Sequence, residues 1–240
     1  MADFDLVIRG NLVLPDRVVE DGYAAVSDGR IAAIGEGKPP SAKENFDARG
    51  RYVLPGAIDG QVHSGSQNPP EGILQTTQAA AAGGVSTIID MPYDDAGPVV
   101  DAETFKAKVA VVEKDAHVDV GLFGTMRKED GVKDLLGQVE AGACAFKFST
   151  YESHPVRFPR IKPLDMLEAF KTLAPTGIGC GVHNENQEMV DELIATLQAG
   201  GRTDPGAHGE SRPPIAEALA MAEIYELGAA ADCRVHVVHA

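Results

Sequence analysis

The sequence predicts an α/β fold built on a parallel sheet and preceded by a short all-β segment. From Leu54 onward, apolar strand-like runs alternate with helical stretches, which is the pattern of successive βαβ units. Before Leu54 the chain has only short strand-like runs separated by glycine, proline and Asp-Gly turns. A closed barrel and an open sheet both fit this pattern, and both place functional residues at the carboxyl ends of their strands.

Composition excludes several classes of partner. The chain has 240 residues, 44% of them hydrophobic, and a net charge of −15. An acidic surface repels phosphate backbones and anionic lipid, so we expect neither nucleic acid nor membrane as a partner. The first residues lack the features of a signal peptide. Cys144, Cys180 and Cys233 lie far apart in apolar segments, which favours reduced thiols and a cytoplasmic protein.

Residues 1–53 are expected to form the N-terminal part of a β domain. The predicted strands of this segment cover residues 5–9, 12–14, 23–26 and 30–34. Ser27-Asp28-Gly29 joins the last two as a tight hairpin, because Asp-Gly accepts the positive φ that such a turn requires. A sheet this small has few ways to complete a core alone, so we expect it to pack on another surface.

Residues 54–240 are expected to form the second, larger domain, which carries the strand ends where functional residues would lie. The predicted strands are 53–62, 85–91, 118–123, 143–148, 178–183 and 234–239. The predicted helices are 71–82, 102–114, 131–140, 163–173, 187–199 and 213–230. A (β/α) barrel needs eight strands and about 250 residues. If the sheet is a barrel, six strands make it incomplete at its C-terminal end.

Histidines stand at the ends of three of the predicted strands or directly after them. His63 follows the first strand, and His183 and His239 end the fifth and sixth. Imidazole is the commonest metal ligand in proteins, so this pattern predicts a divalent metal site. Gln61 should share a face with His63, because side chains alternate along a strand.

Lys147 stands inside an apolar strand and needs a chemical reason to be there. A protonated ammonium group cannot coordinate a cation, and burying it unpaired is costly. The lysine can lose its proton, or it can react with CO₂ to become a carbamate that bridges two metals. Alternatively, it extends to the surface and pairs with a carboxylate such as Glu185.

Two asparagines near the fifth strand are further candidates. Asn184 and Asn186 can orient an amide or urea edge of a substrate, or they can be turn residues at a strand end. A serine hydrolase would need a G-x-S-x-G elbow. Neither Ser64 nor Ser149 has that setting.

Five segments resemble, in order, the signature segments of the cyclic amidohydrolases, the family of hydantoinases, dihydropyrimidinases, allantoinases and dihydroorotases. They are Leu54–His63, Ala80–Pro92, Gly142–Lys147, His183–Asn186 and Ser211–Pro213. The resemblance spans the whole chain. It implies a (β/α)8 metal-dependent hydrolase barrel of the TIM type with a β-sandwich built from both chain ends. The small sheet predicted for residues 1–53 agrees with it.

The resemblance also implies an activity, which is hydrolysis of a C–N bond in a small cyclic amide, ureide or imide. A hydantoinase or allantoinase-like activity is favoured, and a dihydroorotase-like one is the alternative. The family holds one or two divalent ions, zinc first and manganese or iron next, and we expect a dimer or tetramer. The family's aspartate on strand eight would lie beyond Ala240.

Site roles carry over residue by residue. Carbamylated Lys147, with His183 and His239, would hold one metal. His63 would be the remaining histidine ligand of the other metal site. Tyr151 resembles the tyrosine that donates to the oxyanion in dihydropyrimidinases, although its spacing from Lys147 is one residue short.

Gln61 departs from the family pattern, which has histidine at this position. An amide oxygen is a weaker ligand than imidazole for such metals. Three readings follow. A single metal remains at Lys147, His183 and His239, or Gln61 contacts the substrate, or the protein holds no metal and acts as a binding or scaffold protein.

Overall fold

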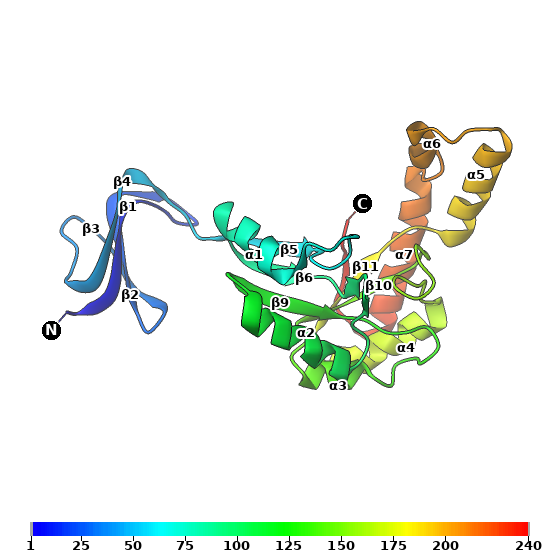
Figure 1. Ribbon diagram of the computed structural model, residues 1–240, viewed down its shortest axis with the longest axis horizontal. Helices are drawn as coiled ribbons and strands as arrows, with labels where there is room; N and C mark the ends of the chain where they lie inside the picture. Colours follow the sequence, from blue (N-terminus) through cyan, green and yellow to red (C-terminus); the bar gives the residue numbers. More distant parts are fainter. Residues whose placement is uncertain (1, 240) are drawn as a thin grey trace. The chain divides into compact units, whose positions relative to one another are not determined.

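The computed structural model describes residues 2–239, and the chain divides into two compact units between Gly56 and Ala57 (Figure 1). The first unit is one four-stranded sheet in the order β3-β2-β1-β4. Its strands are β1 (Phe4–Val13), β2 (Val18–Ser27), β3 (Arg30–Glu36) and β4 (Ala42–Val53). β1 pairs antiparallel with β2 and parallel with β4. One sheet is a single layer of the predicted sandwich, so the sandwich stays a prediction.

The first unit differs from its predicted strands in two ways. The predicted strands 5–9 and 12–14 join into β1, whose register shifts between Gly10 and Leu12. β4 was not predicted, because Ala42–Val53 is mostly polar and exposed and lacks an apolar period of two. This segment is a strand because its backbone pairs with β1, and its own residue pattern does not indicate that pairing.

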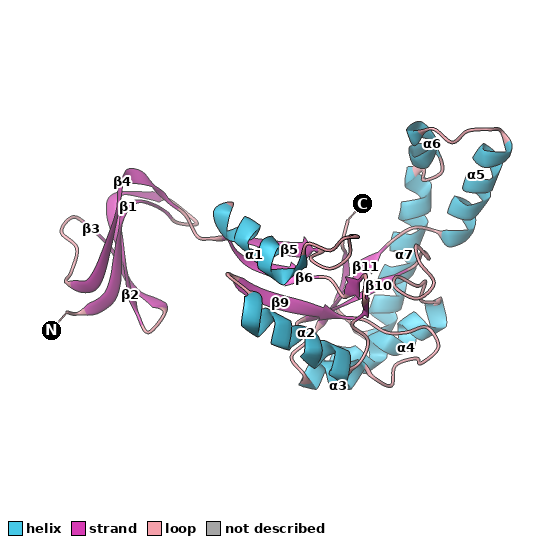
Figure 2. Ribbon diagram, viewed as in Figure 1, coloured by secondary structure: helices cyan, strands magenta, loops and turns pink. Residues whose placement is uncertain are grey.

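The second unit is built on a six-stranded parallel sheet whose spatial order follows the chain. The strands are β5 (Ala57–Val62), β6 (Val85–Asp90), β9 (Asp119–Gly124), β10 (Ala145–Ser149), β11 (Gly179–His183) and β12 (Val235–Val237). Each pairs with the next, in the order β12-β11-β10-β9-β6-β5. In an open doubly wound sheet the spatial order of the strands reverses at a switch point. Here the strand order does not reverse, and the sheet curls in one direction (Figure 2). The topology is that of an incomplete barrel.

The helices of this unit are α1 (Gly72–Ala82), α2 (Ala102–Asp115), α3 (Leu135–Glu140), α4 (Pro163–Leu173), α5 (Gln187–Ala199), α6 (Pro205–Glu210) and α7 (Pro214–Ala231). They cover the convex face of the sheet, except for α5 and α6, which project away from it (Figure 1). The short hairpin of β7 (Tyr93–Asp94) and β8 (Gly97–Pro98) follows β6. All six predicted strands and all six predicted helices of this unit are present, whereas α6 and the β7–β8 hairpin were not predicted. Among residues 2–239, no helix has the length and apolar character needed to cross a bilayer.

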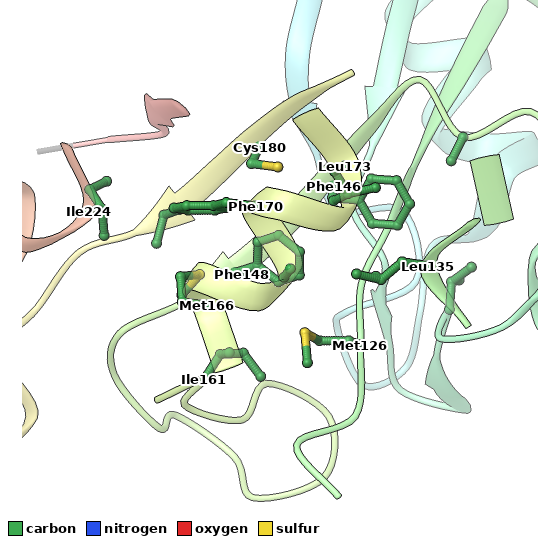
Figure 3. Close-up of a cluster of buried hydrophobic side chains, with 14 of the residues drawn as sticks. Met126, Leu135, Phe146, Phe148, Ile161, Met166, Phe170, Leu173, Cys180 and Ile224 are labelled. Carbon is green, nitrogen blue, oxygen red and sulfur yellow. The ribbon is translucent and has the colours of Figure 1, made fainter. Parts of the chain in front are cut away.

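The core of the second unit lies between β10 and the helices. Phe146 and Phe148 alternate with Lys147 along β10, so both rings point toward the helices and Lys147 points to the opposite, concave face. Both rings are fully buried and pack against Phe170 and Leu173 of α4 (Figure 3). The burial of two aromatic rings on one face therefore fixes the lysine between them on the other.

Candidate metal centre

Four predicted ligands lie at the carboxyl ends of the parallel strands. His63 follows β5, Lys147 is in β10, His183 ends β11, and His239 follows β12. The pKa of His239 is lowered to about 4, first by desolvation and then by the charges of His183 and Lys147. The charge of Lys147 likewise lowers the pKa of His63, after the larger effect of burial. The fold therefore brings the four side chains into one electrostatic neighbourhood.

Lys147 is buried without a partner for its charge. Its side chain is 2% exposed, and Nζ makes no hydrogen bond within residues 2–239. Desolvation lowers the pKa of this amine to about 7. Its main-chain carbonyl is held firmly, because Tyr93 Oη donates to it at 2.9 Å and Thr125 Oγ1 at 2.6 Å. The alternative pairing of Lys147 with Glu185 is wrong, since that carboxylate has other partners.

Glu185 fixes the ring of His183. Its Oε2 lies 2.7 Å from His183 Nε2, and Arg212 Nε lies 2.8 Å from its Oε1. Burial acts to raise the pKa of Glu185, but the bonds to His183 and Arg212 lower it overall. The carboxylate therefore accepts the Nε2 proton, and the lone pair of His183 is on Nδ1. A carboxylate behind a ligating imidazole orients the ring and raises its basicity.

His183 and His239 face one another across a short gap. His183 Nδ1 lies 3.0 Å from His239 Nε2. Nitrogen ligands of zinc lie about 2.0–2.1 Å from the ion, so two nitrogens this close can share one ion. Across residues 2–239, no group of three or more His, Cys, Asp or Glu side chains forms a metal site. Lys147 Nζ has no hydrogen-bond partner within residues 2–239, and as a carbamate this residue would supply a third donor that fits a divalent ion.

His63 is oriented by its own partners. Its Nδ1 lies 2.9 Å from Ser66 Oγ, which itself donates to the carbonyl of Tyr93 at 3.0 Å. Because the only proton of Ser66 is already used, Nδ1 of His63 must donate to it. The remaining nitrogen, Nε2, then carries the lone pair. Gln61 is half-buried two residues earlier, in a part of β5 whose register shifts between Asp59 and Val62.

A buried ion network behind His63 was missed from the sequence. Asp90, at the end of β6, accepts bonds from Ser64 N at 2.8 Å and Ser64 Oγ at 2.6 Å. Lys108 Nζ of α2 lies 2.7 Å from Asp90 and 2.9 Å from Asp94. The available signal was a lysine three residues after Phe105 on the buried stripe of an amphipathic helix. The network fixes the loop that carries His63.

The remaining predicted residues have defined partners. Tyr151 packs with Val190 and Ala216, with the Arg212 guanidinium 5.6 Å from its ring centroid. Asn184 is buried and donates to the carbonyl of Val182 at 2.7 Å, whereas its Oδ1 has no partner in the described chain.

Asn186 caps a helix. Its side chain accepts a bond from Met189 N at 3.0 Å at the start of α5. The amide oxygen of Asn186 is thus used by the fold, and its NH₂ group remains available as a donor.

Known proteins resemble this chain along its whole length. No family model matches it. The allantoinase of Rubrobacter xylanophilus is 34% identical over 243 residues, which are 100% of this chain and 53% of that protein. The allantoinase of Desulfitobacterium hafniense is 35% identical over 244 residues, which are 100% of this chain and 54% of that protein. The chain therefore spans about half the length of the curated relatives it matches.

Solved structures agree with the sequence comparison. The L-hydantoinase (dihydropyrimidinase) from Arthrobacter aurescens superposes with a TM-score of 0.91 at 28% identity, over 99% of this chain and 53% of that one. A D-hydantoinase superposes with a TM-score of 0.84 at 28% identity, over 98% of this chain and 52% of that one. Because fold and sequence agree from one end of the described chain to the other, the chain belongs to the cyclic amidohydrolase family of the amidohydrolase superfamily.

Proposed function

We propose that the protein hydrolyses a C–N bond in a small cyclic amide, ureide or imide, with an allantoinase or hydantoinase-like activity. The similarity to proteins named allantoinase and hydantoinase supports the reaction class. The observation that carries it to this chain is the buried Lys147 Nζ, which has no hydrogen-bond partner within residues 2–239 and lies in the electrostatic neighbourhood of three histidines. A buried amine without a partner is costly unless chemistry removes its charge.

The proposal includes a divalent metal, zinc first, with manganese or iron as alternatives. Lys147, His183 and His239 would hold one ion, and His63 would contribute to a second. A bound divalent metal polarises a carbonyl and lowers the pKa of its water toward neutrality. For Lys147 to serve, CO₂ must add to its neutral amine, and burial favours that neutral form. The new N–C bond forms as the nitrogen releases one proton to solvent, and the product is an anionic carbamate with two oxygen donors.

The other residues of this chain would position the substrate. Asn184 Oδ1, which has no partner within residues 2–239, would offer an acceptor to an amide or urea edge, and the NH₂ group of Asn186 would offer a donor. Gln61 would contact the substrate where a second metal is missing. Tyr151 would donate to the developing oxyanion. The complete (β/α)8 barrel, the β-sandwich, the dimer or tetramer and the cytoplasmic location also remain predictions.

A substrate screen tests the proposal. Hydantoin, dihydrouracil, allantoin, dihydroorotate and succinimide are incubated with metal-supplemented protein, with and without a chelator. We expect ring opening of allantoin or hydantoin that the chelator abolishes and that Lys147→Ala lacks. Lys171→Ala, which removes an exposed lysine on α4, is the matched control. Ring opening of dihydroorotate alone would instead favour the dihydroorotase-like alternative.

Metal analysis separates the enzyme from a scaffold protein with the same fold. The enzyme should retain about one equivalent or more of metal after purification, because the proposed site has three protein donors. Less than about a tenth of an equivalent after metal-supplemented growth, with no turnover of any compound in the screen, would overturn the proposal.

A further inference from the structure

Two free thiols lie next to one another near the amino ends of the last two strands of the sheet. Cys180 lies in β11, and Cys233 lies in the turn that leads into β12. Their Sγ atoms are 3.7 Å apart. The backbones are already paired at this point, because Cys180 N donates to the carbonyl of Arg234 at 2.9 Å. The two sulfurs are therefore neighbours across a fixed strand pairing.

We propose that Cys180 and Cys233 are a redox modification site that forms a reversible disulfide between β11 and the approach to β12. A disulfide needs an S–S distance of about 2.05 Å, so the sulfurs must close by about 1.7 Å. Side-chain rotation about χ1 can supply this closure. This inference is independent of the proposed hydrolysis and needs no metal.

The two thiols have different roles. Cys180 is fully buried, whereas Cys233 is partly exposed and can meet a reagent. The hydrogen bond between the thiols lowers the pKa of Cys233 and raises that of Cys180. Cys233 is therefore the attacking thiol and Cys180 the resolving one.

The oxidant is a peroxide, and the reaction balances in two steps. The Cys233 thiolate attacks one oxygen of hydrogen peroxide, which breaks the O–O bond, leaves hydroxide and forms a sulfenic acid. Cys180 sulfur then attacks the sulfenic sulfur, so that the S–S bond forms and the S–O bond breaks. The departing hydroxide takes the Cys180 proton and leaves as water. The two thiols lose two electrons, and the peroxide gains them.

Cys144 provides an internal comparison. It is exposed, and its thiol donates to the carbonyl of Leu122 at 3.3 Å. A peroxide can reach this sulfur, but in the described structure Cys144 has no neighbouring thiol to resolve it. Oxidation should therefore produce a disulfide inside the chain from one pair only.

The disulfide would link strands that carry two proposed ligands. Cys180 stands three residues before His183, and β12 leads to His239. The bond would close a loop containing α5, α6 and α7 and would hold the pairing of Gly181 with His236. Oxidised protein should therefore unfold at a higher temperature than reduced protein, because the unfolded chain is constrained.

Thiol counting and peptide mapping test the proposal. Reduced protein is treated with a small excess of hydrogen peroxide, quenched with an alkylating reagent and digested with trypsin, which cleaves after Arg202 between the two cysteines. We expect a loss of two free thiols, a mass about 2 Da lower and a linked peptide pair containing Cys180 and Cys233. Dithiothreitol should restore both thiols.

Serine variants distinguish this disulfide from other oxidation. Cys144→Ser should still form the linked pair, whereas Cys180→Ser and Cys233→Ser should not, although all three remain folded by circular dichroism. If one variant fails to fold, the other two and the wild type still decide the outcome. Linkage through Cys144, or retention of both thiols while Cys144 is oxidised, would overturn the proposal.

Discussion

The ammonium group of Lys108 lies 2.7 Å from the carboxylate of Asp90, and both side chains are buried. The lysine also donates to the carbonyl of Met91 at 2.9 Å. Asp90 in turn holds Ser64, the residue after His63. One ion pair therefore connects α2, β6 and the loop of a proposed metal ligand.

Lys108→Met should destabilise the protein strongly. The substitution leaves Asp90 buried without its counter-charge, and breaking a buried pair in this way costs about 3–5 kcal/mol. Denaturant unfolding measures the change in the free energy of unfolding. Lys106→Met removes an exposed lysine of the same helix and should stay within about 0.5 kcal/mol of wild type. Equal effects of the two substitutions would contradict the importance of the ion pair.

Lys147→Met should stabilise the metal-free protein while abolishing activity. Methionine fills a similar volume and removes a buried amine that has no partner in residues 2–239. An unsatisfied buried polar group costs about 1–3 kcal/mol, which the variant regains. The measurement is denaturant unfolding in the presence of a chelator. A variant less stable than wild type under these conditions would show that the buried amine does not destabilise the folded protein.

The stability of metal-free wild type should rise as the pH rises from 7 toward 10.5. Burial lowers the pKa of Lys147 from 10.5 to about 7, so the unfolded chain binds more protons in this window. Stability increases with pH wherever the unfolded state binds more protons, with a slope of at most about 1.4 kcal/mol per pH unit for one group.

Other groups titrate in both proteins, so the difference between wild type and Lys147→Met isolates this lysine. We expect the advantage of Lys147→Met to shrink as the pH rises through the window. A difference that does not change with pH would place the pKa of Lys147 at its ordinary value.

Glu185→Gln should weaken metal binding about 10- to 100-fold, because a neutral amide orients His183 less strictly than a carboxylate. Competition with a chromogenic chelator measures the dissociation constant. Glu188→Gln changes an acidic residue three positions later, whose partner is Arg160 at the surface, and should leave the constant unchanged. If Glu185→Gln binds metal as tightly as wild type does, metal binding does not depend on the orientation of His183 by Glu185.

Gln61→His should raise the metal content from one equivalent to about two. Imidazole at this position would join His63 and complete the donor pair that the family pattern has there. Elemental analysis of purified protein measures the ratio. Gln75→His adds a histidine on the exposed face of α1 and controls for adventitious binding. An unchanged ratio would indicate that Gln61 serves the substrate and not a metal.

The sequence predicted the second unit well because its signals are local. Each strand is an apolar run next to an amphipathic helix, and the ligand candidates follow directly at strand ends. β4 was missed because it is ordered by pairing with β1 and carries few apolar residues. Ser211 does not cap α7, since this helix starts at Pro214 after Pro213 and Ser211 Oγ donates to the carbonyl of His208.

The site was only partly predictable, because several of its contacts come from segments that are distant in the sequence. His183 and His239 stand where strand ends place them, but the partners that set their protonation come from elsewhere in the chain. Arg212 reaches Glu185 from the segment before α7, and Lys108 reaches Asp90 from α2. Such contacts depend on how helices pack, which a local pattern does not encode. The exclusion of the Lys147–Glu185 pair required the structure.

The hairpin of α5 and α6 has a practical consequence for protein engineering. Its turn, residues 200–204, lies at the end farthest from the sheet (Figure 1). Exposed tips with glycine and polar residues tolerate inserted peptides well. The Asn186 cap anchors the opposite end of α5 immediately after His183. A fluorescent label or purification tag inserted after Gly201 should therefore be tolerated and leave the strand ends undisturbed.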